Sequence, residues 1–395
     1  MKKRILIVSE YLYPNNLSTS YYLTNITETL CEEYSCKIIT TTGLNGKEEL
    51  PFLEEKVVRL KDSFFSNDKV ISRIFRSLTF TFKLSWKTFF SLKKNDVIFS
   101  VTNPAFMILM LAVIKKIKKA PYTLLVYDVF PENAVAAGLV KNDSFIYKVS
   151  KKMFDWAYCQ ADRLIVIGRD MEEIIGEKTN NQTTMTLISN WADTDLVMPM
   201  SKKENLIIKK FNLEEKIVFA FIGNLGRVQG IQNLLDAAKL VTNKSFVLLL
   251  IGDGAMRTIV EKHITDHLDG NVIYGGSYPS SEQNIFLNAC DIAIVSLNPS
   301  MYGLGVPSKS YYNMAAGKPL LYIGDKDSEI GRVVTEQDIG WVTEPNNAKE
   351  LAQLFKVISD DNSLSKKGYK SRETVEKYYS KEVVLAKYRK LYSEI

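Results

Sequence analysis

Short apolar runs recur along the chain, separated by stretches long enough to form helices. In the first half these runs are "RILIV", "KIITT", "DVIFS", "YTLLVY" and "RLIVIG". The pattern restarts after residue 213 with "KIVFAFIG", "FVLLLIG", "NVIYG", "DIAIVSL" and "PLLYIG". Buried strands that alternate with helices are typical of doubly wound parallel sheets. The pattern therefore predicts an α/β protein with two such domains.

The stretch around residues 190–213 has no clear period and contains Pro199 and several lysines. It predicts an interdomain connection over 191–213, between domains at 1–190 and 214–395. A length of 395 residues fits two domains. The charged, amphipathic end of the chain, "SRETVEKYYSKEVVLAKYRKLYSEI", predicts a C-terminal helix.

The composition, with 46% hydrophobic and 24% charged residues, is that of an ordinary globular protein. The four cysteines form no C-x-x-C pair, so we expect a reducing, cytoplasmic location. The apolar run near the start is too short for a signal peptide, and the uncharged run over 97–114 is interrupted by Thr102, Asn103 and Pro104. No transmembrane helix is expected.

The net charge of +6 is unevenly distributed, because residues 69–127 contain eleven lysines or arginines and one acid, Asp96. Within this region, residues 69–95 interleave aromatic side chains with seven cations and no acid. This combination favours an anionic membrane surface as a partner, at the inner face of the cell membrane. Single-stranded nucleic acid is the weaker hypothesis, since no RNA-module motif is present, and we expect no nucleic acid partner. A half-buried helix with a solvated basic face is the remaining alternative.

The stretch "LGVPSKSYYNMAAGKP" predicts a short helix that runs to Ala316, with Ser308 as its N-cap and Gly317 after its end. Lys309 then lies in the first turn, where a cation is disfavoured unless an anion binds there. The sequence therefore predicts an anion site at Lys309.

The first strand of the second half leads into "GNLGRVQGIQNLLDAAKL", a glycine-rich turn that places Arg227 near a helix start. Parallel sheets bind ligands beyond the carboxyl ends of their strands, so we expect Arg227 and Lys309 to face one crevice suited to a pyrophosphate. Gly223, Asn224 and Gly226 of the turn are expected to approach the ligand. The alternatives are a solvated loop arginine and a lysine that extends away from the helix.

A second glycine turn, "IGDGA" at 251–255, adds Gly252 to the candidate binding residues. No G-x-G-x-x-G fingerprint follows an N-terminal strand, which disfavours a nicotinamide dehydrogenase.

In the first half, "YDVFPENAVAAG" follows a strand and presents Asp128 and Glu132. These carboxylates are candidates for orienting substrate hydroxyls or acting as a base. Equally, Asp128 or Asn133 would cap the following helix, with Glu132 supporting its start.

Two patterns are compatible with metal ligands. His263 and His267 have the i, i+4 spacing of a metal pair, but we favour a solvated face of an exposed helix. The D-x-D triplets at 193–195 and 325–327 are too short to predict Mg²⁺, and turn or capping roles are favoured. We expect no essential metal.

Several of these motifs together resemble the family-4 glycosyltransferases. They are "FIGNLGRVQGIQNLLDAA", "LLIGDGA", "VIYGG", "ADTDLV" after "SNW", and "GVPSKSYYNMAAGKPLLYIGD". Within that family, "VYDVFPENAVAAGLV" and the P-S-K-x-Y form of the last motif resemble the bacterial O-antigen and capsule transferases of the L-fucosamine-transferase-like group.

The resemblance implies the GT-B fold, in which two Rossmann-like domains face a cleft, with the nucleotide-sugar donor on the C-terminal domain and the acceptor on the N-terminal one. Arg227 and Lys309 match the family's pyrophosphate cations. The residues implied to approach the diphosphate and the sugar, or to form the turn beside them, are Gly303, Leu304, Gly305, Val306, Pro307 and Ser308.

The chain departs from the family pattern at several positions. Many members have two glutamates in this loop, where this chain has Leu304 and Tyr312, and a lysine where it has Gln229. Many also have a glycine-rich loop near residue 14, for which Asn15, Asn16 or Ser18 are the candidate substitutes. The resemblance implies UDP as the nucleotide and allows an N-acetylated or deoxy sugar.

The predicted function is retaining transfer of a sugar from a nucleotide diphosphate to a lipid-linked glycan in bacterial surface polysaccharide synthesis. The donor is a substrate, and no further cofactor is expected. The alternatives are a non-catalytic nucleotide-sugar or glycan-binding protein and a sugar-nucleotide epimerase.

Overall fold

The computed structural model describes residues 4–13, 17–42, 54–61, 70–267 and 270–394. Contacts within the chain group it into two compact units. One consists of Met1–Ser189, Gly303–Gly305 and Leu385–Ile395, and the other of Asn190–Tyr302 and Val306–Val384. The domain limits at 1–190, 191–213 and 214–395 stay a prediction.

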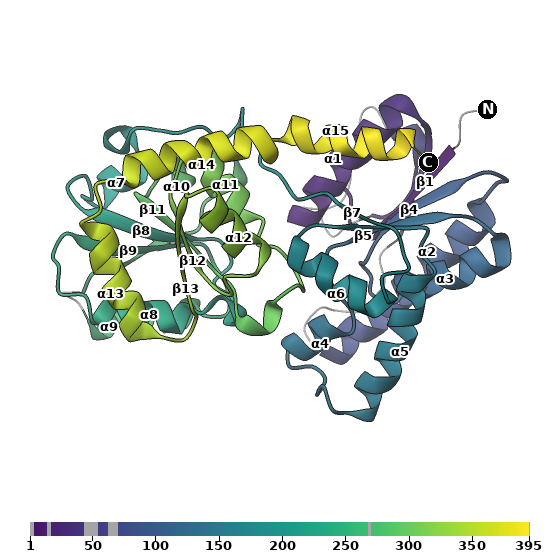
Figure 1. Ribbon diagram of the computed structural model, residues 1–395, viewed down its shortest axis with the longest axis horizontal. Helices are drawn as coiled ribbons and strands as arrows, with labels where there is room; N and C mark the ends of the chain where they lie inside the picture. Colours follow the sequence, from purple (N-terminus) through teal and green to yellow (C-terminus); the bar gives the residue numbers. More distant parts are fainter. Residues whose placement is uncertain (1–3, 14–16, 43–53, 62–69, 268–269, 395) are drawn as a thin grey trace. The chain divides into compact units, whose positions relative to one another are not determined.

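The first unit is built on a parallel sheet, in the order β3-β2-β1-β4-β5-β6-β7 (Figure 1). Its strands are β1 (Arg4–Val8), β2 (Ser35–Thr41), β3 (Val57–Leu60), β4 (Val97–Val101), β5 (Tyr122–Val126), β6 (Arg163–Val166) and β7 (Met185–Leu187). The five strands that coincide with the apolar runs lie inside the sheet. The two edge strands, β3 and β7, were not predicted, because they are short and only partly buried.

Helices cover both faces of this sheet. They are α1 (Ser18–Glu33), α2 (Val70–Ser91), α3 (Met107–Lys118), α4 (Glu132–Ala136), α5 (Phe145–Cys159), α6 (Arg169–Thr179) and the last part of α15 (Lys381–Ser393), with the 3-10 turn η1 (Glu54–Lys56). Within one layer, α2 packs on α3, α3 on α5 and α5 on α6. On the other face, the ion pair Arg389–Glu32 (2.9 Å) joins α15 to α1.

The second unit has a parallel sheet in the order β10-β9-β8-β11-β12-β13. Its strands are β8 (Ile217–Ile222), β9 (Phe246–Ile251), β10 (Val272–Gly276), β11 (Ile292–Ser296), β12 (Leu320–Ile323) and β13 (Gly340–Thr343). Its helices are η2 (Lys202–Glu204), α7 (Leu206–Lys210), η3 (Arg227–Gln229), α8 (Ile231–Lys239), α9 (Arg257–Asp266), η4 (Ser280–Glu282), α10 (Gln283–Leu287), η5 (Pro299–Met301), α11 (Lys309–Ala315), α12 (Glu329–Glu336), α13 (Ala348–Ser359) and α14 (Leu364–Tyr378).

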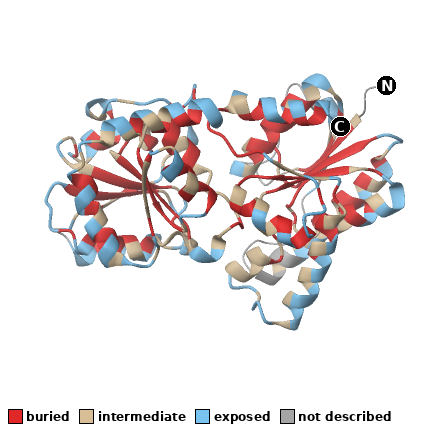
Figure 2. Cartoon of the chain, in the orientation of Figure 1, coloured by how far each residue is buried: buried red, intermediate tan, exposed pale blue. Residues whose placement is uncertain are grey.

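Each face of the second sheet packs against its own apolar cluster, so strand β8 is buried on both sides (Figure 2). Val218 and Ala220 join one cluster, while Phe219 and Phe221 join the other. Burial on both faces is why the strands of a doubly wound sheet appear as continuous apolar runs. The prediction of two Rossmann-like α/β domains is confirmed. Among the described helices, none is long and apolar enough to cross a membrane.

Candidate functional site

Two glycine turns lie against each other at the carboxyl edge of the second sheet. The N–H of Gly223, after β8, donates to the carbonyl of Ile251 at the end of β9 (2.9 Å). Gly252 has φ +132°, and a Cβ there would overlap the carbonyl oxygen of Gly223. The N–H of Leu225 also donates to the carbonyl of Asp253 (2.8 Å). Glycine is thus required for the two turns to approach so closely.

Lys309 lies beside the first of these turns, although it is the first residue of α11 and far away in sequence. Its Nζ is 3.7 Å from the centroid of the Phe221 ring in β8 and 3.3 Å from Oε1 of Gln229. Burial lowers the pKa of Lys309 to about 7. The structure therefore brings a partly desolvated cation, a neutral amide and a glycine turn together at one sheet edge.

The predicted capping role of Ser308 is wrong. Ser308 has helical φ and ψ (−58°, −25°) and its side chain caps no N–H, whereas an N-cap residue needs an extended backbone. The predicted short helix is confirmed, since α11 spans seven residues, ends at Ala315 and has Lys309 in its first turn. Contacts with the ring and the amide hold Lys309 in place.

Arg227 is exposed and begins the 3-10 turn η3, one short element before α8. Gly230 (φ +61°) separates that turn from α8, so Arg227 is not in the first turn of the α-helix. Gln229, on the same turn, is the residue that contacts Lys309. Asn224 is exposed and Gly226 is partly exposed on the loop before η3.

The loop residues at 303–306 and Tyr312 are largely engaged in packing. The N–H of Gly303 donates to the Asp170 carboxylate (3.2 Å), and Leu304 is buried. Val306 and Tyr312 pack against an apolar cluster of the second unit. The backbone around Gly303 was expected to approach a diphosphate, but the N–H of Gly303 is already bonded to Asp170.

Asp128 follows β5 and accepts hydrogen bonds from the side-chain amides of Asn103 (3.1 Å) and Asn133 (2.7 Å). Burial raises its pKa, and the two amides partly offset that effect. The proposed capping role is wrong, because no side chain caps the start of α4. Asp128 thus presents a held, partly buried carboxylate at the carboxyl edge of the first sheet.

Glu132 has a structural partner that the sequence did not indicate. Both of its oxygens lie 2.7 Å from Nζ of Lys178, which also pairs with Asp155 (2.6 Å). The Lys178 side chain is 1% exposed. Because the Glu132 carboxylate neutralises a buried ammonium, its position is accounted for without a substrate.

The expectations about the histidines and the D-x-D triplets have different outcomes. His263 is buried, not exposed, and its ring stacks on that of His267, which lies beyond the end of α9. The turn roles of the triplets are confirmed, since Asp193 accepts from the N–H of Asp195 (3.2 Å) and Asp325 from that of Asp327 (2.8 Å). Among the described residues, no group of three acids, histidines or cysteines is placed to hold a metal.

Of the three candidates near residue 14, Asn15 and Asn16 lie outside the described residues. Ser18 is exposed at the first position of α1.

The sequence reasoning missed an exposed apolar stripe on α5. It consists of Phe145, Ile146, Val149, Met153 and Trp156. Its spacing is that of an ordinary amphipathic helix, which predicts an apolar face directed to the core. Only the packing reveals that these side chains face solvent.

Comparisons with known proteins agree with this architecture. The family model "Glycosyl transferases group 1" matches residues 202–379. WbjE of Pseudomonas aeruginosa, named a probable glycosyltransferase, is 37% identical over 392 residues, which span 98% of this chain and 96% of WbjE. Sucrose-phosphate synthase from Thermosynechococcus elongatus has a TM-score of 0.77 at 15% identity, over 100% of this chain and 99% of that one. HepE of Anabaena, crystallised with UDP, has a TM-score of 0.74 at 14% identity over 100% of both chains.

The two parallel, doubly wound α/β units match the GT-B fold of the glycosyltransferases among the solved structures. The chain belongs to the group 1 glycosyl transferases. Membership of this family does not favour the two alternatives, a non-catalytic nucleotide-sugar or glycan-binding protein and a sugar-nucleotide epimerase.

The role of Glu132 is testable through its partner. Lys178→Met leaves two carboxylates without their buried cation, so we expect the free energy of unfolding to fall by about 3–5 kcal/mol in urea denaturation. Lys151→Met, at a more exposed lysine paired with the same two acids, should cost under about 1 kcal/mol. A Glu132→Gln variant with unchanged stability and no transferase activity would contradict the structural role.

Proposed function

We propose that the protein transfers a sugar from a UDP-sugar to a lipid-linked glycan in bacterial surface polysaccharide synthesis, with retention of configuration. The observation that carries the proposal is the Lys309 ammonium beside the Gly223 turn. The relationship to WbjE supports sugar transfer, and the UDP bound to the structural neighbour HepE supports the choice of nucleotide. An N-acetylated or deoxy sugar, and the L-fucosamine-transferase-like group, are the finer parts of this proposal.

The chemistry needs positive charge where the diphosphate leaves. Lys309 would stabilise the negative charge of the leaving diphosphate from the sheet edge, and the exposed Arg227 would do so from the η3 turn. Gly223 and Gly252 would let the phosphates approach the backbone closely. At the position where many relatives have a lysine, Gln229 keeps Lys309 oriented through its amide oxygen (3.3 Å).

The acceptor side of the proposal rests on the first unit. Asp128 is the carboxylate held at the carboxyl edge of its sheet, where it would orient an acceptor hydroxyl. A lipid-linked acceptor also requires a membrane surface, and we propose that residues 69–95 provide the contact, at the cytoplasmic face.

Helix α2 supports this membrane contact because some of its apolar side chains are buried and others are exposed to solvent. Phe80 and Leu84 are buried, whereas Phe82, Trp86 and Phe90 are 63%, 59% and 64% exposed. The exposed rings adjoin along the helix, with centroids 5.9 Å and 4.8 Å apart. A helix with a solvated basic face accounts for the lysines but not for three exposed aromatic rings.

Diphosphate binding is the first test. We expect UDP to raise the melting temperature more than GDP, ADP or dTDP does, and Lys309→Ala to raise the Kd for UDP about 10- to 100-fold, since a charged contact is lost. Lys244→Ala, at an exposed lysine that precedes β9 at the opposite edge of the same sheet, is the matched control and should leave the Kd unchanged. Equal UDP affinity in both variants would overturn the assignment of Lys309.

The pH dependence of UDP binding follows from the pKa of Lys309, about 7. Below that pH the ammonium is already charged, while above it binding must take up a proton. The Kd for UDP should therefore rise with pH above 7, by up to about tenfold per unit. Calorimetric titrations from pH 6 to about 9 measure this slope, which should disappear in Lys309→Ala. A slope that persisted in this variant would assign the proton to another group.

Membrane contact is tested by sedimentation with vesicles of phosphatidylcholine and phosphatidylglycerol. The variant Phe82→Ser/Trp86→Ser/Phe90→Ser should bind at least about tenfold more weakly, because its apolar rings no longer enter the interface. The matched control, Leu206→Ser/Leu240→Ser/Val357→Ser, removes exposed apolar side chains of the second unit and should bind like wild type. Equal sedimentation of the two variants would contradict the assigned surface.

A further inference from the structure

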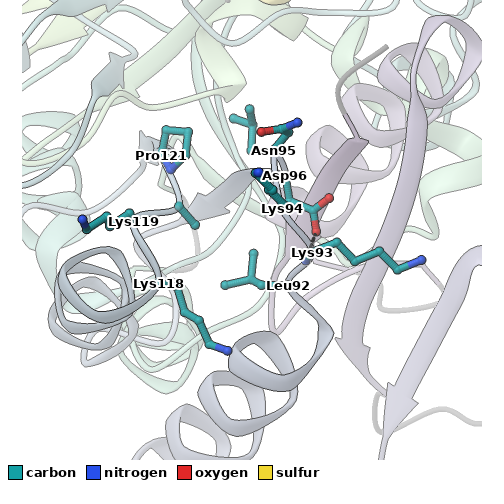
Figure 3. A pocket seen from close by; sticks show the side chains of 10 residues that line it. Leu92, Lys93, Lys94, Asn95, Asp96, Lys118, Lys119 and Pro121 are labelled. Atoms are coloured by element: carbon teal, nitrogen blue, oxygen red, sulfur yellow. Dashed lines mark hydrogen bonds between the residues drawn. The ribbon is translucent and has the colours of Figure 1, made fainter. Parts of the chain in front are cut away.

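A cavity of about 650 Å³ lies at the amino edge of the first sheet, remote from the candidate catalytic residues of this unit (Figure 3). It is lined by residues 92–97, which lead into β4, and by residues 118–121, which lead into β5. Asp128 follows the opposite end of β5, and a five-residue strand spans roughly 16 Å. The cavity is therefore separate from the edge proposed to orient the acceptor hydroxyl.

The cavity is strongly positive. Its lining includes Lys93, Lys94, Lys118 and Lys119, and Figure 3 shows Lys93 and Lys119 directed to opposite sides of it. In the described part of the chain, none of these four ammonium groups forms an ion pair. The lysines thus surround the hollow with uncompensated charge.

The one acid of the lining, Asp96, does not offset this charge. Its carboxylate accepts from Nε (3.0 Å) and Nη2 (2.5 Å) of Arg4 and from the backbone N–H of Lys93 (2.7 Å). Outside the lining, the pKa of Lys37 is lowered by burial and then by nearby cations that include Lys87.

Exposed apolar side chains lie close in sequence to both segments that line the cavity. Phe90 lies in the last turn of α2 and is 64% exposed, and Ile117 lies in the last turn of α3 and is 62% exposed. The ammonium of Lys118 is 4.1 Å from the centroid of the Phe89 ring, so charge and aromatic surface meet at the cavity. A free anion would need only the cations. A phospholipid would use both, with its phosphate among the lysines and its acyl chains against the apolar side chains.

We propose that this cavity binds the phosphate-bearing headgroup of an anionic phospholipid. The inference rests on the proposed membrane contact of α2 and names the lipid chemistry that fixes it. The alternative is that these lysines only stabilise the carboxyl ends of α2 and α3 by their positive charge. In that case anionic lipid would bind the cavity no better than it binds the rest of the basic surface.

The test compares two variants of the full chain that lose the same charge. Lys94→Gln/Lys119→Gln removes one lysine from each side of the cavity, and Lys83→Gln/Lys87→Gln removes two from α2 outside its lining. Binding is measured by sedimentation with phosphatidylcholine vesicles, with and without phosphatidylglycerol. Diffuse attraction predicts losses on the order of 30-fold for either pair, whereas a headgroup site predicts that the cavity pair loses at least about tenfold more than the control pair.

The outcomes separate this inference from the proposed transferase. Retained UDP stabilisation in both variants shows that they are folded and that the donor site is independent of the cavity. Equal losses for the two pairs would overturn the headgroup site while leaving the membrane contact standing. No sedimentation of wild type would overturn both membrane claims but not the donor site. A melting shift with inorganic phosphate that requires Lys94 and Lys119, without a sedimentation difference, would identify a free-phosphate site and also overturn the proposal.

Discussion

The close approach of two backbone turns is the constraint on which the candidate donor site depends. Parallel strands end at one edge, so the turns after β8 and β9 necessarily meet there. They fit together because Gly252 lacks a side chain, since a Cβ there would overlap the carbonyl oxygen of Gly223. The stem of Lys309 lies beside Gly223, and its ammonium lies over the ring of Phe221. The edge proposed to bind the diphosphate is thus built mainly from backbone, with one cation added.

Lys178 and Lys309 both have lowered pKa values, but the groups that surround their ammonium groups differ. Lys178 lies between the carboxylates of Glu132 and Asp155, which makes it part of the architecture of the first unit. Lys309 contacts an aromatic ring and a neutral amide. Those contacts orient it but compensate its desolvation poorly, and its pKa is lowered to about 7. The proposed diphosphate supplies the negative charge that these two contacts lack.

The first unit separates two tasks along one sheet. Its carboxyl edge holds Asp128 between two asparagine amides, where a substrate hydroxyl would be oriented. Its amino edge and the adjoining helix α2 carry exposed rings and unpaired lysines, which suit a lipid surface. Because the strands keep these edges apart, membrane attachment and sugar transfer would be served by different residues of one sheet.

The sequence by itself determined the doubly wound folds, because strands buried on both faces require the continuous apolar runs that it contains. It also predicted the glycine turns after β8 and β9, since turn chemistry is local, and it singled out Lys309 as a candidate. It did not indicate the edge strands β3, β7 and β13, whose burial is partial. Nor did it reveal the Glu132–Lys178 pair, the contact of Gln229 with Lys309 or the exposed stripe of α5. Only tertiary structure decided these features, because each depends on which distant segment packs, or fails to pack, against a side chain.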